Sequence, residues 1–255
     1  EIEVRSYILY PSLNMFVRNR YYKNENFLKC INDIPLQFSE ILFNDKKKEE
    51  SLCYFKQMIT IDKTDDLISF IDSANEILSE TVDNICSSDV KVLCYSLTFG
   101  DYNFAFQLFK RVKKEKTNMK IVVGGSMCNP AMTNSIMKIC PEIDYIICDD
   151  DVNTFKELIQ TILLNKSYND ACVANKNSKA IVSNKIEDLN NLPCPDFTDF
   201  LSNIEKLHIK KENIIVPYEI SRGCWWGEKK PCAMCGYFGY QKKFLIKSPS
   251  KVIED

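Results

Sequence analysis

The sequence has no long apolar run and no excess of one charge, and it contains a single histidine. Its 33 basic and 35 acidic side chains leave a formal net charge of -2. The sequence therefore lacks the excess of basic residues that is typical of nucleic-acid-binding proteins. No segment approaches the roughly 20 apolar residues that cross a bilayer, and the start Glu1-Ile2-Glu3-Val4 lacks a charged-then-apolar secretory pattern. We therefore expect a cytoplasmic globular protein that binds neither nucleic acid nor membrane.

Twelve cysteines are present, but their distribution does not indicate a disulfide framework. Nine of them are scattered singly through apolar or mixed segments of a fairly long chain. We expect these nine to be small buried hydrophobic residues: Cys30, Cys53, Cys86, Cys94, Cys128, Cys140, Cys148, Cys172 and Cys194.

Short apolar segments alternate with helical patterns along the chain. Strands are predicted over residues 4–10, 91–97, 119–123 and 145–148. Helices are predicted over residues 65–87, after Asp101 as N-cap, over 131–139 and over 153–164. The expected inward residues are Leu67, Ile71, Ala74, Leu78, Val82 and Ile85 in the first helix, Phe104, Leu108 and Val112 in the second, and Phe155, Leu158, Ile159 and Ile162 in the last.

This alternation favours an α/β fold with an open parallel sheet covered by helices on both faces and right-handed crossovers. Ligands of such sheets sit beyond the carboxyl ends of the strands, which selects residues 96–100, 124–129 and 149–152 as one rim. Residues 174–200 are polar and carry Pro193, Cys194 and Pro195, so we expect a linker there. A further strand over residues 214–220 leads into the remaining cysteines.

Cys224, Cys232 and Cys235 place three thiols within twelve residues. Thiolates at this spacing bind soft metals or iron-sulfur clusters. Three ligands leave one iron of a cluster open, whereas a structural zinc site requires four ligands in a closed tetrahedron. The alternative is a zinc knuckle in which His208 or another cysteine is the fourth ligand, although a lone histidine among lysines is more typical of a surface position.

The segment SRGCWWGEKKPCAMCG, followed by KSPSKVIED, closely resembles the cluster motif of radical S-adenosylmethionine enzymes that mature ribosomally made peptides, a family that includes cobalamin-dependent C-methyltransferases. The seven residues between the first two cysteines match this subgroup. The resemblance implies that Cys224, Cys232 and Cys235 ligate a 4Fe-4S cluster, with S-adenosylmethionine on the fourth iron and Gly236 near its methionine moiety. Met234 replaces the aromatic residue common before the third cysteine.

Upstream, VLCYSLTFGDYNFAFQLFKRVKKEKTNMKIVVGGSMCNPAM is similar to the cobalamin-binding-type domain of the family, and LNNLPCPDFTDF to its interdomain linker. The resemblance implies that Ser96, Thr98, Gly124, Gly125 and Ser126 contact the nucleotide tail of cobalamin. Asp150 stands in the triple Asp that replaces a Gly-Glu-Gly type loop. No Asp-x-His-x-x-Gly is present, so cobalt would be held without a histidine.

The resemblance divides the chain into a Rossmann-like cobalamin-binding domain over residues 1–173, a linker over 174–212, and the first strand and cluster loop of a radical enzyme barrel over 213–255. The first strand of the sheet and most of the barrel are expected to be missing, as in an inactive fragment. A peptide substrate and an electron donor protein are the implied partners. The competing hypothesis is a non-catalytic Rossmann-like module with a structural zinc site.

Overall fold

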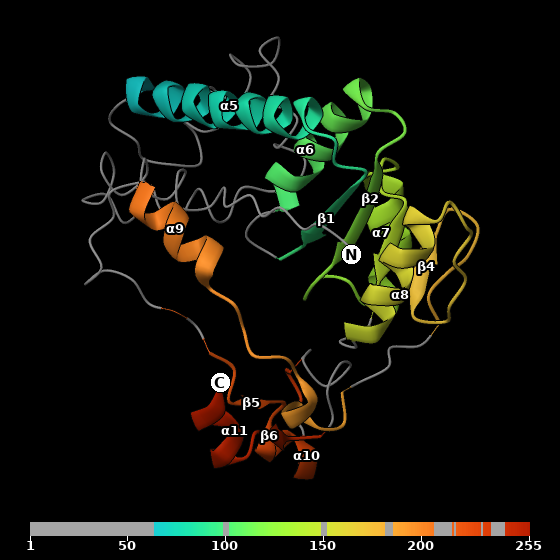
Figure 1. Ribbon diagram of the computed structural model, residues 1–255, viewed down its shortest axis with the longest axis vertical. Coiled ribbons are helices and arrows are strands. Elements are labelled where there is room, and N and C mark those ends of the chain that lie inside the picture. Colours follow the sequence, from blue (N-terminus) through green and yellow to red (C-terminus); the bar gives the residue numbers. More distant parts are fainter. Residues whose placement is uncertain are drawn as a thin grey trace. The chain divides into compact units, whose positions relative to one another are not determined.

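Figure 1 shows the computed structural model, which describes residues 64–98, 102–148, 152–181, 186–206, 216, 218–230, 232–235 and 243–255. The described residues divide into two units. One holds those up to Met127 together with Ser135–Asp144, and the other holds Cys128–Asn134 and Tyr145–Asp255. The strand predicted over residues 4–10 and the N-cap predicted at Asp101 lie outside the described residues.

Two amphipathic helices of the first unit pack against each other. Helix α5 (Thr64–Ser87) buries Leu78, Val82 and Ile85, which lie three and four positions apart and therefore share one face. From helix α6 (Tyr102–Glu115), Arg111 donates hydrogen bonds to Ser79 Oγ at 3.1 Å and Asn75 Oδ1 at 2.9 Å. Both helices were predicted from their apolar periodicity.

The sheet has four strands in the order β1-β2-β3-β4 and is mostly parallel. Strand β1 (Val92–Ser96) pairs in parallel with β2 (Lys120–Gly124), from Val92 opposite Lys120 to Ser96 opposite Gly124. Strand β3 (Tyr145–Ile147) neighbours β2, and β4 (Val173–Asn175) is antiparallel to β3. The α/β architecture with a mostly parallel sheet is thus confirmed, and it is compatible with a Rossmann-like fold.

Burial differs between the two parallel strands. Ile121, Val122 and Val123 of β2 are buried, as expected for a strand covered on both faces. Strand β1 is partly exposed and lies at an edge of the described sheet. The ring of Tyr95 on this strand meets Phe109 of α6 edge-on, with 5.4 Å between the ring centroids, so α6 packs against β1 through aromatic contact.

A half-buried carboxylate joins α6 to the end of the β2–β3 connection. Asp144 Oδ2 accepts hydrogen bonds from Ile121 N at 2.9 Å and Lys113 Nζ at 2.7 Å. The Asp144 amide in turn donates to Ile121 O at 2.9 Å. The basic end of α6 therefore has a structural use, since Lys113 neutralises a carboxylate with little solvent around it.

Helices α7 (Pro130–Ile139) and α8 (Val152–Leu163) match the helices predicted before and after β3 in the sequence. Leu158, Ile159 and Ile162 are buried in α8 as expected. Phe155 is 42% exposed, so its expected inward position is wrong. The residue lies in the first turn of α8, where helical spacing fixes the direction of a side chain but not whether anything covers that end.

Two other details differ from the sequence predictions. The expected linker begins with residues of β4, and it also contains the short 3-10 helix η3 (Leu189–Asn191) and helix α9 (Thr198–Lys206). In place of a strand over residues 214–220, the strand β5 comprises Ser221–Arg222, and the described residues 216 and 218–220 are not in a strand.

The scattered cysteines follow the prediction in part. Cys128, Cys140, Cys148 and Cys172 are buried. Cys94 and Cys194 are exposed and Cys86 is half-buried, so these three are not core residues. Cys94 lies on strand β1, whose side chains are partly exposed, and Cys30 and Cys53 lie outside the described residues.

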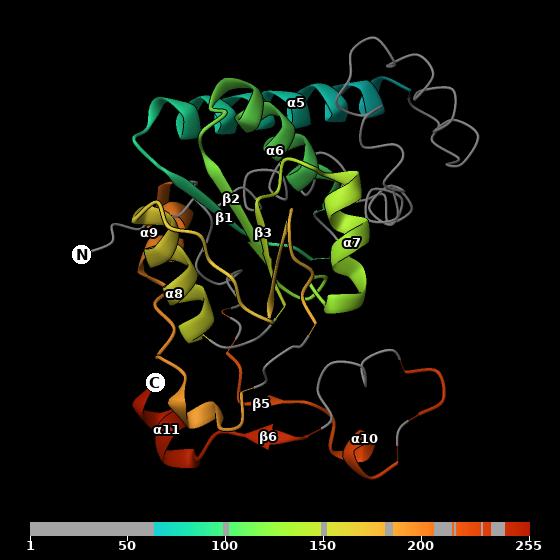
Figure 2. The ribbon, with the colours of Figure 1, turned by 90° about the vertical axis from the view of Figure 1, so that its right-hand side faces the viewer.

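The last part of the second unit is a two-stranded antiparallel sheet with short helices (Figure 2). Strand β5 pairs with β6 (Leu245–Ile246). Helix α10 (Trp225–Lys229) follows β5, and helix α11 (Pro249–Glu254) follows β6. In the part of the chain that the structure describes, no helix has the length and apolar character needed to cross a membrane.

Candidate iron-sulfur site

The cysteine loop leaves and returns through the β5–β6 pair. Ser221 lies opposite Ile246, and Arg222 lies opposite Leu245. The chain between them, residues 223–244, contains all three of the predicted ligands. A strand pair of two residues a side is weak by itself, so the closure of this loop depends on further contacts.

Gly223 makes the first of these contacts, with Lys243 and Phe244. Its φ of 95° lies in the left-handed region, and a Cβ there would fall far inside van der Waals distance of the Lys243 carbonyl oxygen and 3.1 Å from Phe244 Cα. Only glycine allows this backbone conformation and this close approach together. Gly223 therefore brings the start of the cysteine loop against its end.

Cys224 begins helix α10. It is the N-cap residue, and its Sγ accepts a hydrogen bond from Gly227 N at 3.4 Å. The amide of Glu228 donates to Cys224 O at 3.0 Å. The seven-residue spacing to Cys232 is thus filled largely by a turn of helix that starts at the first ligand.

The two tryptophans that follow Cys224 are not core residues. Trp225 is 53% exposed and Trp226 is 51% exposed, with 6.2 Å between their ring centroids. Lys229 Nζ lies 4.3 Å from the centroid of the Trp225 ring, a cation–π contact along one face of α10. The pair therefore leaves aromatic surface open beside the first predicted ligand.

Cys232 and Cys235 are exposed free thiols joined by a turn, in which Cys235 N donates to Cys232 O at 3.0 Å. Met234 between them is 98% exposed. Within the described ranges, no group of three or more His, Cys, Asp or Glu side chains lies close enough to hold a metal ion. The three thiols are thus free for ligation but not gathered around one point.

The chemistry of this donor set nevertheless fits an iron-sulfur cluster. Three free thiols are available in one loop, and Cys224 Sγ already accepts an amide hydrogen bond of the kind that tunes cluster sulfurs. Gly236 and the alternative zinc ligand His208 lie outside the described residues.

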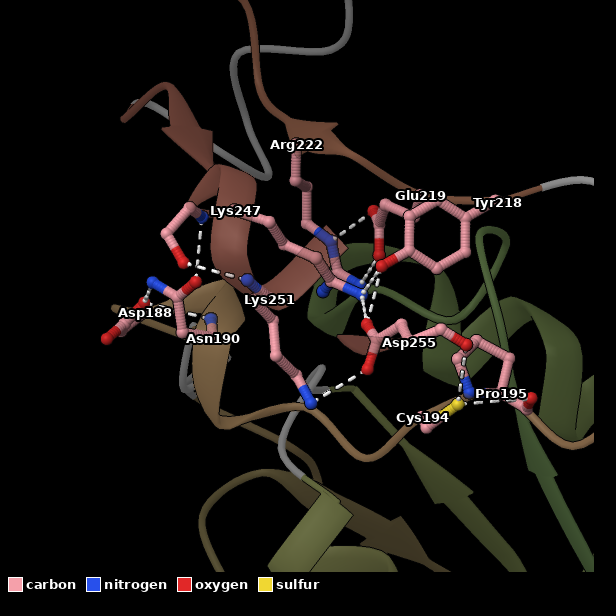
Figure 3. Close-up of polar contacts among 11 residues, drawn as sticks. Asp188, Asn190, Cys194, Pro195, Tyr218, Glu219, Arg222, Lys247, Lys251 and Asp255 are labelled. Carbon is pink, nitrogen blue, oxygen red and sulfur yellow. Dashed lines mark hydrogen bonds and ion pairs between the residues drawn. The ribbon is translucent and has the colours of Figure 1, made fainter. Parts of the chain in front are cut away.

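A largely buried polar cluster joins Tyr218, Lys247, Lys251 and Asp255 (Figure 3). The Asp255 carboxylate, with 0% of its side chain exposed, pairs with Lys247 Nζ at 2.7 Å and Lys251 Nζ at 2.7 Å and accepts from Tyr218 OH at 2.5 Å. These hydrogen bonds, with that from Lys247 the largest cause, hold the pKa of Asp255 well below its usual value. The same pairing raises the pKa of Lys247.

The cluster ties helix α11 to the strand that leads into the loop. Tyr218 lies just before β5, and Lys247 N donates to Ile220 O at 2.9 Å. The guanidinium of Arg222 is held by both carboxylate oxygens of Glu219 at 2.7 Å each. The base of the cysteine loop is therefore fixed by ionic contacts as well as by the strand pair (Figure 3).

The expected linker also contacts α11, at both ends of the helix. Asn190 Oδ1 accepts from Ser248 N at 2.8 Å at the N-cap. Cys194 Sγ donates to the Asp255 carbonyl oxygen at 3.3 Å at the C-cap. Sequence reasoning missed these contacts, although Ser248 followed by Pro249 is a typical helix start that the sequence displays.

At the carboxyl ends of β1 and β2 the structure brings together most of the predicted rim. Ser96 and Gly124 are opposite each other, and Thr98 and Ser126 are exposed nearby along the chain. Gly125 has a φ of 101°, and a Cβ there would lie 2.7 Å from Leu97 O and 2.9 Å from Ser96 Oγ. A tight turn therefore exists at this rim, while Asp150 lies outside the described residues.

Neither a model of a known protein family nor a curated protein matches this chain.

Proposed function

We propose that the protein is a radical S-adenosylmethionine enzyme whose Cys224, Cys232 and Cys235 hold a 4Fe-4S cluster. The observation that carries the proposal is the loop of three free thiols, of which the first caps a helix directly after β5. Three thiolates would ligate three irons and leave the fourth open to S-adenosylmethionine. When bound, the cluster supplies the electron that splits this cofactor.

The proposed substrate is a ribosomally made peptide. This follows from the resemblance of the cysteine motif to enzymes of peptide maturation. The half-exposed Trp225 and Trp226 offer aromatic surface next to the first ligand, which supports contact with a partner chain at this loop. The second proposed partner is a protein that donates the electron needed to reduce the cluster.

The proposal extends to cobalamin and C-methylation through the rim of the sheet. Ser96, Thr98 and Ser126 present hydroxyl groups, and the open space beside Gly124 lets a ligand approach the backbone there. Gly125 allows the tight turn that places these groups at the rim, since Leu97 and Ser96 fill the space beside it. These groups would hold the nucleotide tail, and no residue in the sequence matches the usual histidine motif for cobalt. Hydroxocobalamin titration followed by electron paramagnetic resonance of cobalt(II) tests this, and histidine superhyperfine splitting would contradict the absence of an imidazole ligand.

Metal analysis after anaerobic reconstitution tests the cluster itself. We expect about four iron and about four sulfide per chain, and a Cys232→Ala variant should lose most of both. Cys94→Ala is the matched control, because Cys94 is also an exposed free thiol but lies on strand β1, outside the loop. A single zinc per chain, with no iron uptake, would favour the non-catalytic module with a structural zinc site.

A further inference from the structure

Two contacts close the cysteine loop on the same short segment before β6. Gly223 presses against the Lys243 carbonyl. Glu228 Oε2 accepts a hydrogen bond from Phe244 N at 3.2 Å, across sixteen positions of sequence. The two anchors come from opposite sides of Cys224 and reach adjacent residues, so they hold the first predicted ligand at a fixed place relative to β6.

The segment between the anchors is short and internally bonded. Glu228 N donates to Cys224 O at 3.0 Å, and Gly227 N donates to Cys224 Sγ at 3.4 Å. The cation–π contact of Lys229 with Trp225 adds a side-chain link along the same turn of helix. Because these bonds join Glu228 and Gly227 to Cys224, a contact made by the Glu228 carboxylate also constrains the backbone and sulfur of Cys224.

The other two thiols are held differently. Cys232 and Cys235 are both exposed, whereas Cys224 is half-buried. In the turn that joins Cys232 and Cys235, Cys235 N donates a hydrogen bond to Cys232 O. The three ligands are therefore unequal before any metal arrives. One has a defined position, and two are on an open turn.

We infer that Glu228 is a positioning residue that holds Cys224 in place for cluster assembly. Cys224 then binds the metal first, and Cys232 and Cys235 bind it afterwards. This inference rests on the proposed function, because a cluster is what the preset ligand serves. The carboxylate acts through the Phe244 amide. The carboxylate is exposed, and its hydrogen bond from Phe244 N links α10 to the segment before β6.

The first test uses the reduced protein without metal and measures the alkylation rate of each cysteine by mass spectrometry. Cys224 should react more slowly than Cys232 and Cys235. Loss of a hydrogen bond worth about 1 kcal/mol should raise the Cys224 rate about fivefold in Glu228→Ala. Glu228→Gln keeps a carbonyl acceptor and should stay within about twofold of the original rate, since the bond to Phe244 N survives.

Glu187→Ala is the matched control, because Glu187 is an exposed carboxylate in the same unit. It should leave all three rates unchanged. Circular dichroism of each variant separates a local opening from loss of the fold, and the Gln variant keeps the inference testable if Glu228→Ala does not fold. Unchanged Cys224 reactivity in a folded Glu228→Ala, or equal effects of Ala and Gln, would overturn the inference.

The second test repeats anaerobic reconstitution with the same variants. Glu228→Ala should bind iron and sulfide more slowly than the original protein, and Glu228→Gln should restore the rate. If the original protein takes up no iron, the proposed function fails while the alkylation test still judges the role of Glu228. If the original protein forms a cluster and Glu228→Ala forms it equally fast, the role of Glu228 fails alone.

Discussion

Replacing Gly125 with alanine tests the tight turn at the carboxyl ends of β1 and β2. The φ of 101° is unfavourable for any residue with a Cβ, at about 1–2 kcal/mol. The added methyl would also lie 2.7 Å from Leu97 O, 2.8 Å from Leu97 N and 2.9 Å from Ser96 Oγ. Crowding of this kind costs about 1–3 kcal/mol, so the free energy of unfolding should fall by about 2–5 kcal/mol in total.

Gly124 is the matched control, because a Cβ there would meet nothing within 4 Å. Gly124→Ala should leave the free energy of unfolding within about 0.5 kcal/mol of the original or raise it slightly, since glycine weakens a strand. Urea unfolding followed by circular dichroism measures both, and a loss of 3 kcal/mol corresponds to roughly 6–12 °C in melting temperature. Equal stability of the two variants would refute the turn geometry.

Three further predictions concern two carboxylates and one thiol with little exposure to solvent. Asp144→Ala removes the acceptor for Ile121 N and the partner of Lys113, so urea unfolding should show a loss of about 1–3 kcal/mol, and Asp144→Asn, which keeps an acceptor, should lose less. The lowered pKa of Asp255 means that its contribution to stability is present above the usual value of 3.8 and is lost as the pH falls through the native pKa. The urea midpoint should therefore fall in acid, and Asp255→Asn should flatten that dependence; an equal slope in both proteins would contradict the pairing. Burial, with a smaller effect of nearby Cys148, raises the pKa of Cys128 to about 12, so Cys128 should resist alkylation at pH 8 until urea unfolds the protein, and fast reaction of the native thiol would show that it is not buried.

The helices and parallel strands were predictable because their signals are local. The stripe of Leu78, Val82 and Ile85 defines one face of α5 whatever surrounds it. Strand β2 likewise is a short apolar run followed by a glycine turn. In both cases the pattern of side chains along the sequence is enough to specify the element.

Strand β4 was missed because its stability is not local. Its three residues, Val173–Asn175, gain their hydrogen bonds from β3, for example with Val173 opposite Ile147. Nothing in the polar sequence that follows indicates this partner. The exposed Phe155 has a similar origin, since helical spacing does not reveal what covers the end of a helix.

At the candidate site, the sequence identified the three cysteines but not the contacts that organise the loop. The spacing of thiols shows which ligands are available. It does not show that Gly223 and Glu228 meet Lys243 and Phe244, because that meeting depends on how the chain returns to β6. Long-range backbone contacts of this kind become visible only in three dimensions.

The central claim is that three thiolates hold a cluster with one iron open to S-adenosylmethionine. Its most direct test is electron paramagnetic resonance of the reconstituted protein after reduction, recorded before and after adding S-adenosylmethionine. We expect the signal of a reduced 4Fe-4S cluster that changes in g-values when the cofactor binds, and that is lost in Cys224→Ala. A protein that takes up zinc and gives no such signal, or a cluster signal that the cofactor leaves unchanged, would contradict this claim.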